Sequence, residues 1–394
     1  MKENGKTGEE VLVEKIIEGK TELIVPEASI QSTIPPRTPA FYNPKAELNR
    51  DISMAAYRIF SKDKASSTIM ADSLAGVGAR GIRVAMEVPD VKEVHINDGN
   101  LQAINLAKKS AHLNRVSEKC FFSVLEICQF LTSHSAPKKR FTILDIDPFG
   151  SPAPYLDCAL RSIENKGLFS TTATDMPVLC GVYPKVSYRK YQGHSLRTEY
   201  SHEIGIRLLF GAVAHNAMRL GLGIIPLFAY RTRHYFRVYM TIQSGAGWEE
   251  RTHKKIGFIL HCFKCGHRAV DTIPNKECPT CNTLMKHAGP LWTGPIHHKN
   301  FLIELAHDFD TYSLKMGAKI ASIALQEIDM PPTYFTIDKI SSKMGVATPS
   351  INSIILAIKK EGYRASRTAL NSKGIKTDAS NEILQKIVKM FAKN

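Results

Sequence analysis

A carboxylate, a proline and an aromatic ring follow one another at Asp147, Pro148 and Phe149, directly after an apolar run that starts at Phe141. This order suits chemistry on an aromatic amine, which is a poor nucleophile because its lone pair is delocalised into the ring. A carboxylate that accepts the N–H hydrogen bond restores electron density and can take the proton, while the neighbouring ring stacks on the base. The alternative is an ordinary strand-ending turn with a solvated acid and a core phenylalanine.

A glycine-rich turn upstream joins a strand-like run to a helix-like run and contains Asp72, Gly76, Gly78 and Arg80. Glycines at the carboxyl end of a first parallel strand allow the backbone to approach a ligand closely. A turn built only for tight helix packing would have the same composition. Asp98 ends the next strand-like run, where an acid pairs with the ribose of an adenosine-containing cofactor or caps the following helix.

Two Cys-x-x-Cys pairs are separated by twelve residues and comprise Cys262, Cys265, Cys278 and Cys281. Each pair forms a knuckle that supplies two thiolates to a tetrahedral ion, and four thiolates close the shell. The pattern therefore predicts a structural zinc site, with a pair of redox disulfides as the competing interpretation. His261 and His267 stand beside a complete ligand set and are expected at the surface. The other four cysteines are scattered, as in proteins of a reducing compartment.

Short apolar runs alternate with helix-like segments between residues 67 and 147. Because strands separated by helices form parallel crossovers, the alternation predicts a doubly wound α/β sheet with right-handed connections. The expected strands are residues 68–74, 91–96, 121–124 and 141–147.

The residues that follow predict how this sheet is completed. A further strand is expected at residues 168–175, and a helix at residues 199–220 that Gly221 ends. The β-rich runs at residues 224–231 and 235–243 are linked so tightly that they must pair antiparallel. Five parallel strands closed by an antiparallel hairpin resemble the Rossmann-like sheet of class I methyltransferases that use S-adenosylmethionine.

Three parts of the chain are expected. Residues 1–66 form an N-terminal extension with a strand pair, and residues 67–250 form the methyltransferase core. Residues 251–394 form a C-terminal α+β domain with a zinc ribbon at 258–290 and a winged-helix-like module at 330–394. The helix-turn-helix pattern behind the last assignment is equally compatible with a plain helical subdomain.

The charge of the chain predicts a polyanionic partner. The sequence has 52 Lys and Arg against 37 Asp and Glu, and 10 of its 15 surplus positive charges fall in residues 251–394. Clustered cations gain free energy by displacing counterions from phosphates, so the C-terminal third is expected to bind nucleic acid. Residues 183–200 interleave aromatic and basic side chains, which suits base stacking or a solvated loop.

The hydropathy of the chain favours a cytoplasmic protein. The first ten residues are polar, and the longest uncharged apolar run, residues 220–230, is too short to span a bilayer. No membrane association is expected, and no feature of the sequence indicates an obligate protein partner.

Several short blocks, in this order and separation, resemble the tRNA (guanine-26-N2) dimethyltransferase family over almost the whole length. The blocks are Phe41-Tyr42-Asn43-Pro44, Asn49-Arg50-Asp51, the glycine turn, Asn97-Asp98, Asp147-Pro148-Phe149-Gly150, Leu196-Arg197-Thr198-Glu199-Tyr200, the cysteine pairs, Gly289-Pro290-Leu291-Trp292 and Ile375-Lys376-Thr377-Asp378. The resemblance implies methyl transfer from S-adenosylmethionine to the exocyclic N2 of a guanine in tRNA, at position 26. The implied products are N2-methylguanosine and N2,N2-dimethylguanosine.

The resemblance also implies roles for single residues. Asp147 would activate the guanine amine, and Phe41 and Phe149 would sandwich the base. The S-adenosylmethionine pocket would be lined by Arg50, Arg80 or its neighbour Arg83, Asp98, Glu126 and Ile127. Two other functions fit the same residues, namely an amino-methyltransferase acting on adenine in DNA and a non-catalytic zinc-containing RNA-binding protein.

Overall fold

The computed structural model describes residues 11–32, 34, 36–37, 39–62, 64 and 68–391. The chain forms two compact units, Met1–Asp145 and Ile146–Asn394. The expected boundary at residues 66 and 67, the first ten residues and the last three residues lie outside the described part.

The first unit begins with an antiparallel strand pair, β1 (Val13–Glu18) and β2 (Thr21–Pro26), as predicted. The short helix α1 (Glu27–Gln31) follows, and a 3-10 turn, η1 (Pro44–Ala46), leads into α2 (Glu47–Lys62). Asn43 caps η1, because its side chain accepts a hydrogen bond from the backbone N–H of Lys45.

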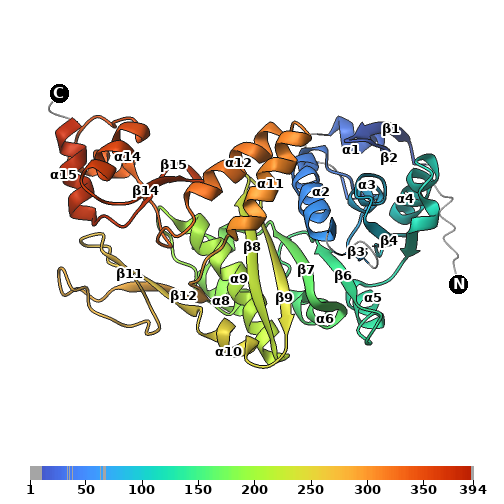
Figure 1. The fold of residues 1–394 in the computed structure, drawn as a ribbon, viewed down its shortest axis with the longest axis horizontal. Helices are drawn as coiled ribbons and strands as arrows, with labels where there is room; N and C mark the ends of the chain where they lie inside the picture. The colour runs from blue at the N-terminus through green and yellow to red at the C-terminus, as the bar shows by residue number, and fades with distance from the viewer. Residues whose placement is uncertain are drawn as a thin grey trace, which may run out of the picture. The chain divides into compact units, whose positions relative to one another are not determined.

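Four parallel strands of the sheet follow in strict alternation with helices. The elements are β3 (Thr68–Asp72), α3 (Ala79–Glu87), β4 (Val91–Asn97), α4 (Leu101–Leu113), η2 (Ser117–Lys119), β5 (Cys120–Ser123), α5 (Ile127–Ser133) and β6 (Phe141–Ile146). Their order is β5-β4-β3-β6, with α3 and α4 beside β3 and β4 (Figure 1). Every residue of β6 is buried, so this strand lies in the core and ends at the Asp147 turn.

The second unit completes the sheet. Its elements are η3 (Ala153–Tyr155), α6 (Leu156–Ser162), β7 (Ile163–Ala173), α7 (Met176–Leu179), α8 (Pro184–Tyr191), α9 (Ser201–Arg219), β8 (Leu222–Arg231) and β9 (Phe236–Ser244). β7, β9 and β8 pair antiparallel in that order, which confirms the hairpin. With the parallel strands they make seven strands, and the predicted fold class is confirmed. The prediction missed α8, which occupies part of the basic and aromatic segment.

A second, smaller sheet carries the cysteine pairs. It follows α10 (Trp248–His253) and consists of β10 (Ile256–His261), β11 (Arg268–Asp271) and β12 (Lys286–Trp292), in the order β11-β10-β12. The pairing is antiparallel throughout, so the strands form the scaffold of a ribbon.

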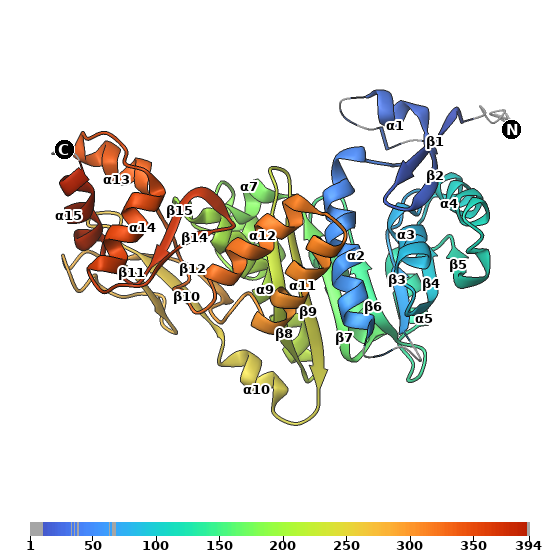
Figure 2. The same ribbon diagram turned by 45° about the horizontal axis from the view of Figure 1, so that its top comes forward.

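Two long helices and a C-terminal module of helices and short strands complete the chain. The helices are α11 (Lys299–Thr311) and α12 (Lys315–Gln326). The module consists of β13 (Phe335–Thr336), α13 (Ile337–Met344), α14 (Ile351–Lys360), β14 (Ala365–Thr368), β15 (Asn371–Thr377) and α15 (Asn381–Phe391), with its helices gathered beside β14 and β15 (Figure 2). Buried aliphatic side chains such as Ile354, Ile375 and Leu384 form its own core. Among the described residues, no helix has both the length and the apolarity to cross a membrane.

Candidate functional site

The glycine-rich turn after β3 brings backbone groups very close together. Gly76 has a φ of +54°, and a Cβ there would lie 2.7 Å from the carbonyl oxygen of Phe41. The same oxygen accepts a hydrogen bond from the Val77 N–H at 3.3 Å. Gly78, at a φ of +75°, caps α3, where a Cβ would lie 2.7 Å from the Cβ of Ala107. Both positions therefore require glycine, and the segment that carries Phe41 lies directly on the turn.

Asp98 is hydrogen-bonded to the glycine turn. Its Oδ2 accepts from the Gly76 N–H at 2.8 Å, and its Oδ1 accepts from the Asn100 N–H at 2.9 Å. Asn100 rather than Asp98 is the N-cap of α4, since its side chain accepts from the first N–H groups of that helix. The predicted acid therefore lies at the carboxyl end of β4 beside the turn, which is where a ribose-binding acid is required.

Asp72 has a structural partner in the same turn. Its Oδ2 accepts a hydrogen bond from the Gly81 N–H at 2.9 Å, and the residue is buried. The bond ties the end of β3 to the first turn of α3 and so fixes the conformation of the glycines between them.

Two of the predicted cofactor residues, Arg50 and Arg80, are buried and ion-paired. The Nε of Arg50 lies 2.6 Å from Oε1 of Glu18, and Arg83 reaches the same oxygen at 2.8 Å. Although burial would raise the pKa of Glu18, hydrogen bonds and charge from Arg50 and Arg83 lower it to about 2. Arg80 Nε lies 3.2 Å from Oδ1 of Asp145. The contact of these arginines with S-adenosylmethionine stays a prediction.

Glu126 and Ile127 follow β5 at the start of α5. The side chain of Glu126 is the N-cap and accepts from the backbone N–H groups of Cys128 and Gln129 at 2.8 and 3.1 Å. Ile127 is buried. Their predicted contact with the cofactor is untested, although their place after the third parallel strand suits it.

Asn97 is a positioning residue to which the sequence analysis assigned no role of its own. Its buried amide donates to the carbonyl oxygens of Ser73 and Leu125, each at 3.1 Å, and its Oδ1 accepts from Ser123 Oγ at 2.8 Å. One side chain therefore fixes the loops after three parallel strands. A polar residue closing an apolar strand is the sequence signal that could have identified it.

In the second unit, the turn at Asp147 is held to the end of β7. The Gly150 N–H donates to Thr174 Oγ1 at 2.7 Å, and the Thr174 N–H donates to the Gly150 carbonyl at 2.8 Å. Pro148 is buried, Asp147 is half-buried, and the Phe149 side chain is 53% exposed. The carboxylate and the ring are thus presented on a rigid turn rather than on a loose loop.

Two tyrosines and a second aspartate lie near this turn. Burial raises the pKa of Tyr235 to about 12, and the nearby carboxylate of Asp147 contributes to the increase. Asp175 accepts hydrogen bonds from the hydroxyl of Tyr191 at 2.5 Å and from Lys190 at 3.2 Å. Lys190 and Tyr191, which belong to the basic and aromatic segment, therefore form hydrogen bonds within the protein itself.

The four cysteines of the ribbon converge on one point. All of the Sγ atoms lie within 4.8 Å of one another, and the shortest separations are 3.4 Å, between Cys262 and Cys281 and between Cys265 and Cys278. A tetrahedral ion with Zn–S bonds of 2.3 Å requires sulfur atoms about 3.8 Å apart. The donor set therefore fits a four-thiolate zinc site.

One of the two histidines beside the ribbon differs from expectation. His261 is buried and its ring accepts or donates a hydrogen bond with the Tyr200 hydroxyl at 2.9 Å, so the predicted surface location is wrong for this residue. The described metal-compatible cluster contains cysteines alone.

Comparison with known proteins agrees with this geometry. The sequence profile of a family described as N2,N2-dimethylguanosine tRNA methyltransferase matches residues 19–389. A tRNA (guanine(26)-N(2))-dimethyltransferase of Methanothermobacter thermautotrophicus is 37% identical over 92% of this chain and 95% of the relative. One of Pyrococcus abyssi is 34% identical over 95% of this chain and 98% of the relative. The structure of Trm1 from Pyrococcus horikoshii with S-adenosyl-L-methionine superimposes with a TM-score of 0.84 at 30% identity, over 95% of this chain and 99% of that one.

Proposed function

Because this chain belongs to the N2,N2-dimethylguanosine tRNA methyltransferase family, we propose that it methylates the exocyclic N2 of guanine 26 in tRNA. The observation that carries the proposal is the rigid Asp147-Pro148-Phe149 turn at the end of a buried parallel strand, in a chain that matches the family over residues 19–389. Repetition of the reaction would give N2,N2-dimethylguanosine.

S-adenosylmethionine, when bound, supplies an electrophilic methyl group. The residues that fit it are Asp98, hydrogen-bonded to the glycine turn, and the turn itself with Gly76 and Gly78. Arg50, Arg80, Glu126 and Ile127 complete the proposed pocket. In this proposal Asp72 acts indirectly, because its carboxylate holds the turn through Gly81.

Asp147 performs the proton chemistry. Its carboxylate accepts a hydrogen bond from the guanine amine, raises the electron density on N2 and takes the proton as the N–C bond forms and the bond from the methyl group to the donor sulfur breaks, which leaves a neutral thioether. The exposed ring of Phe149 stacks on the base, and Phe41 is assigned to the other face. The guanine must leave its stack to reach these groups, since its amine is inaccessible inside a helix.

Substitution of Asp147 tests the proposal. Asp147→Asn and Asp147→Ala should lower the rate of methyl transfer to tRNA roughly 10²- to 10⁴-fold, because a general base is removed. Nucleoside mass spectrometry of digested tRNA measures both products, and calorimetry measures cofactor affinity. Asp310→Asn, at an exposed acid of α11, is the control and should keep wild-type rates.

Full methyl transfer by Asp147→Ala with normal cofactor binding would refute the assigned role. If the wild-type protein methylated duplex DNA in preference to tRNA, the proposed tRNA substrate would be wrong.

The four ribbon cysteines are proposed to hold one structural zinc ion. A zinc ion in a closed four-thiolate shell contributes folding energy. Removal of the ion should therefore unfold the β10–β12 ribbon. Cys278→Ser should release the metal, measured by elemental analysis of the purified protein, whereas Cys180→Ser, outside the cluster, should retain one zinc per chain. A protein that keeps its ribbon protected from hydrogen exchange after the metal is removed would contradict the structural role.

A further inference from the structure

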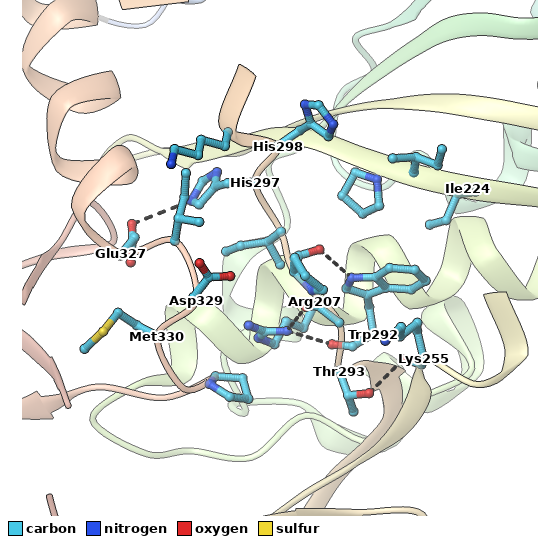
Figure 3. Close-up of a pocket in the computed structure, with 18 of the residues that line it drawn as sticks. Arg207, Ile224, Lys255, Trp292, Thr293, His297, His298, Glu327, Asp329 and Met330 are labelled. Atoms are coloured by element: carbon cyan, nitrogen blue, oxygen red, sulfur yellow. Dashed lines mark hydrogen bonds and ion pairs between the residues drawn. The ribbon is translucent and has the colours of Figure 1, made fainter. Parts of the chain in front are cut away.

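The second unit contains a cavity of about 730 Å³ that neither the Asp147 turn nor the cysteine cluster lines. This volume lies within the range of small-molecule binding sites. The wall is formed by residues 292–300 and 327–330 and by the start of β8, together with Arg207, Trp248, Arg251, Thr252, Lys255, Pro332 and Lys376 (Figure 3). None of the predicted site residues is among them.

One end of the cavity is suited to an anion. The 13-residue helix α11 begins there at Lys299, and its first backbone N–H groups carry the positive end of the helix dipole. Arg251, Lys255 and Lys299 also line the cavity and are exposed, and in the described part of the chain none of the three has an ion-pair partner.

A buried histidine on the same wall lacks a hydrogen-bond partner. His297 is 8% exposed, and neither of its ring nitrogens forms a hydrogen bond with the described residues. Its Nε2 lies 3.6 Å from Oε1 of the buried Glu327, at the ion-pair distance that a dashed line marks in Figure 3. Because buried polar groups are nearly always satisfied, the Nδ1 of this imidazole, which has no partner among the described residues, indicates that a polar group enters from the cavity.

The cavity also offers a face for a planar ring. Trp248 is half-buried, and the guanidinium of Arg251 lies 4.7 Å from the centre of its ring. Trp292 is held rigid by a hydrogen bond from its Nε1 to the Pro295 carbonyl at 2.8 Å. Aromatic faces and arginine planes are the groups on which nucleic-acid bases stack.

We propose, resting on the function proposed above, that this cavity receives an unpaired nucleotide of the bound tRNA other than the guanine that is methylated. Its phosphate lies at the start of α11 beside Lys255 and Lys299, and its base lies against Trp248. A nucleotide of RNA is favoured over a free one because the unpaired cations are exposed at the surface, within the C-terminal third that carries most of the positive surplus.

Two adjacent lysines provide a matched experiment. Lys255 lines the cavity, whereas its neighbour Lys254 is exposed and does not. The affinity of Lys255→Gln, Lys299→Gln and Lys254→Gln for unmodified tRNA is measured as a function of salt concentration. The slope of log K against log salt should fall by about 1 in the first two variants, because each loses a phosphate contact, and should stay at the wild-type value in Lys254→Gln.

A second readout separates binding from chemistry. The rate at saturating tRNA should be unchanged in Lys255→Gln and Lys299→Gln, while KM rises. The inference is overturned if the slope of log K against log salt in these two variants equals that of Lys254→Gln. The proposed function is unaffected by that result, provided that the wild-type protein methylates tRNA in the same assay. Saturable binding of AMP that tRNA does not displace also overturns it, because the cavity would then serve a free nucleotide.

Discussion

The two units each contain a buried glutamate held by two cations, Glu18 in the first and Glu203 in the second, but the two clusters are satisfied to different degrees. Both oxygens of Glu18 accept hydrogen bonds, from Arg50, Arg83 and the hydroxyl of Tyr42. In the second cluster, Oε1 of Glu203 accepts from Arg207 and Lys376, while Oε2 has no hydrogen-bond partner among the described residues.

One cluster lies among elements of the first unit, whereas the other borders the cavity for which we propose a ligand. The Glu18 cluster joins the β1–β2 turn to α2 and α3, and so holds the segment before α2 in place. The Glu203 cluster joins α9 to β15, and its members Arg207 and Lys376 line the cavity that His297 also lines.

Glu18→Gln should have the largest effect on stability. The amide leaves Arg50 and Arg83 buried without their shared counter-charge, and breaking a buried ion pair in this way costs about 3–5 kcal/mol. Urea unfolding followed by circular dichroism measures the loss. Glu22→Gln, which removes only the exposed pair with Lys15, is the control and should cost less than about 1 kcal/mol. Equal losses in the two variants would show that the Glu18 cluster is not a structural element.

The pH dependence of stability gives the next largest effect. The pKa of Glu18 is lowered from 4.5 to about 2 in the folded chain, so its contribution is complete above pH 4.5 and is lost as the pH falls toward 2. The shift corresponds to about 3 kcal/mol. The difference in unfolding free energy between the wild type and Glu18→Gln should therefore shrink between pH 4.5 and 2. A difference that stays constant over this range would rule out ionisation of Glu18 as its source.

The sequence predicted the parts of the site that depend on neighbours along the chain. The cysteine knuckles, the glycine turn and Asp98 follow from local spacing, and the structure brings each group together. The partners of Glu18 could not be predicted, because Arg50 and Arg83 lie 32 and 65 residues away. Apolar periodicity shows which face of an element is buried, but it does not show which acidic side chain pairs with which basic one.

The cavity escaped prediction for the same reason. His297 and Lys376 come from distant segments, and neither belongs to a spacing pattern that would indicate a ligand. The resemblance to the family included Lys376 in one of its blocks without a role, and the structure pairs this lysine with Glu203 at 2.8 Å.

Glu203→Gln should be the mildest change in a buried cluster. Lys376 keeps Glu327 as a second counter-charge, 3.5 Å from its Nζ. The amide oxygen can keep the hydrogen bonds from Arg207 and Lys376, and the amide N–H₂ takes the position of the oxygen that has no partner among the described residues. The expected cost is about 1–3 kcal/mol, below that of the same substitution at Glu18. Tryptophan fluorescence during unfolding measures it, because both tryptophans, Trp248 and Trp292, lie in the second unit.

The same variant also reports on the ligand. Loss of the Glu203 charge leaves Arg207 and Lys376 more positive at the cavity wall, so an anionic ligand should bind at least as tightly as in the wild type. Weaker tRNA binding by a folded Glu203→Gln protein would contradict an anionic ligand beside Arg207 and Lys376.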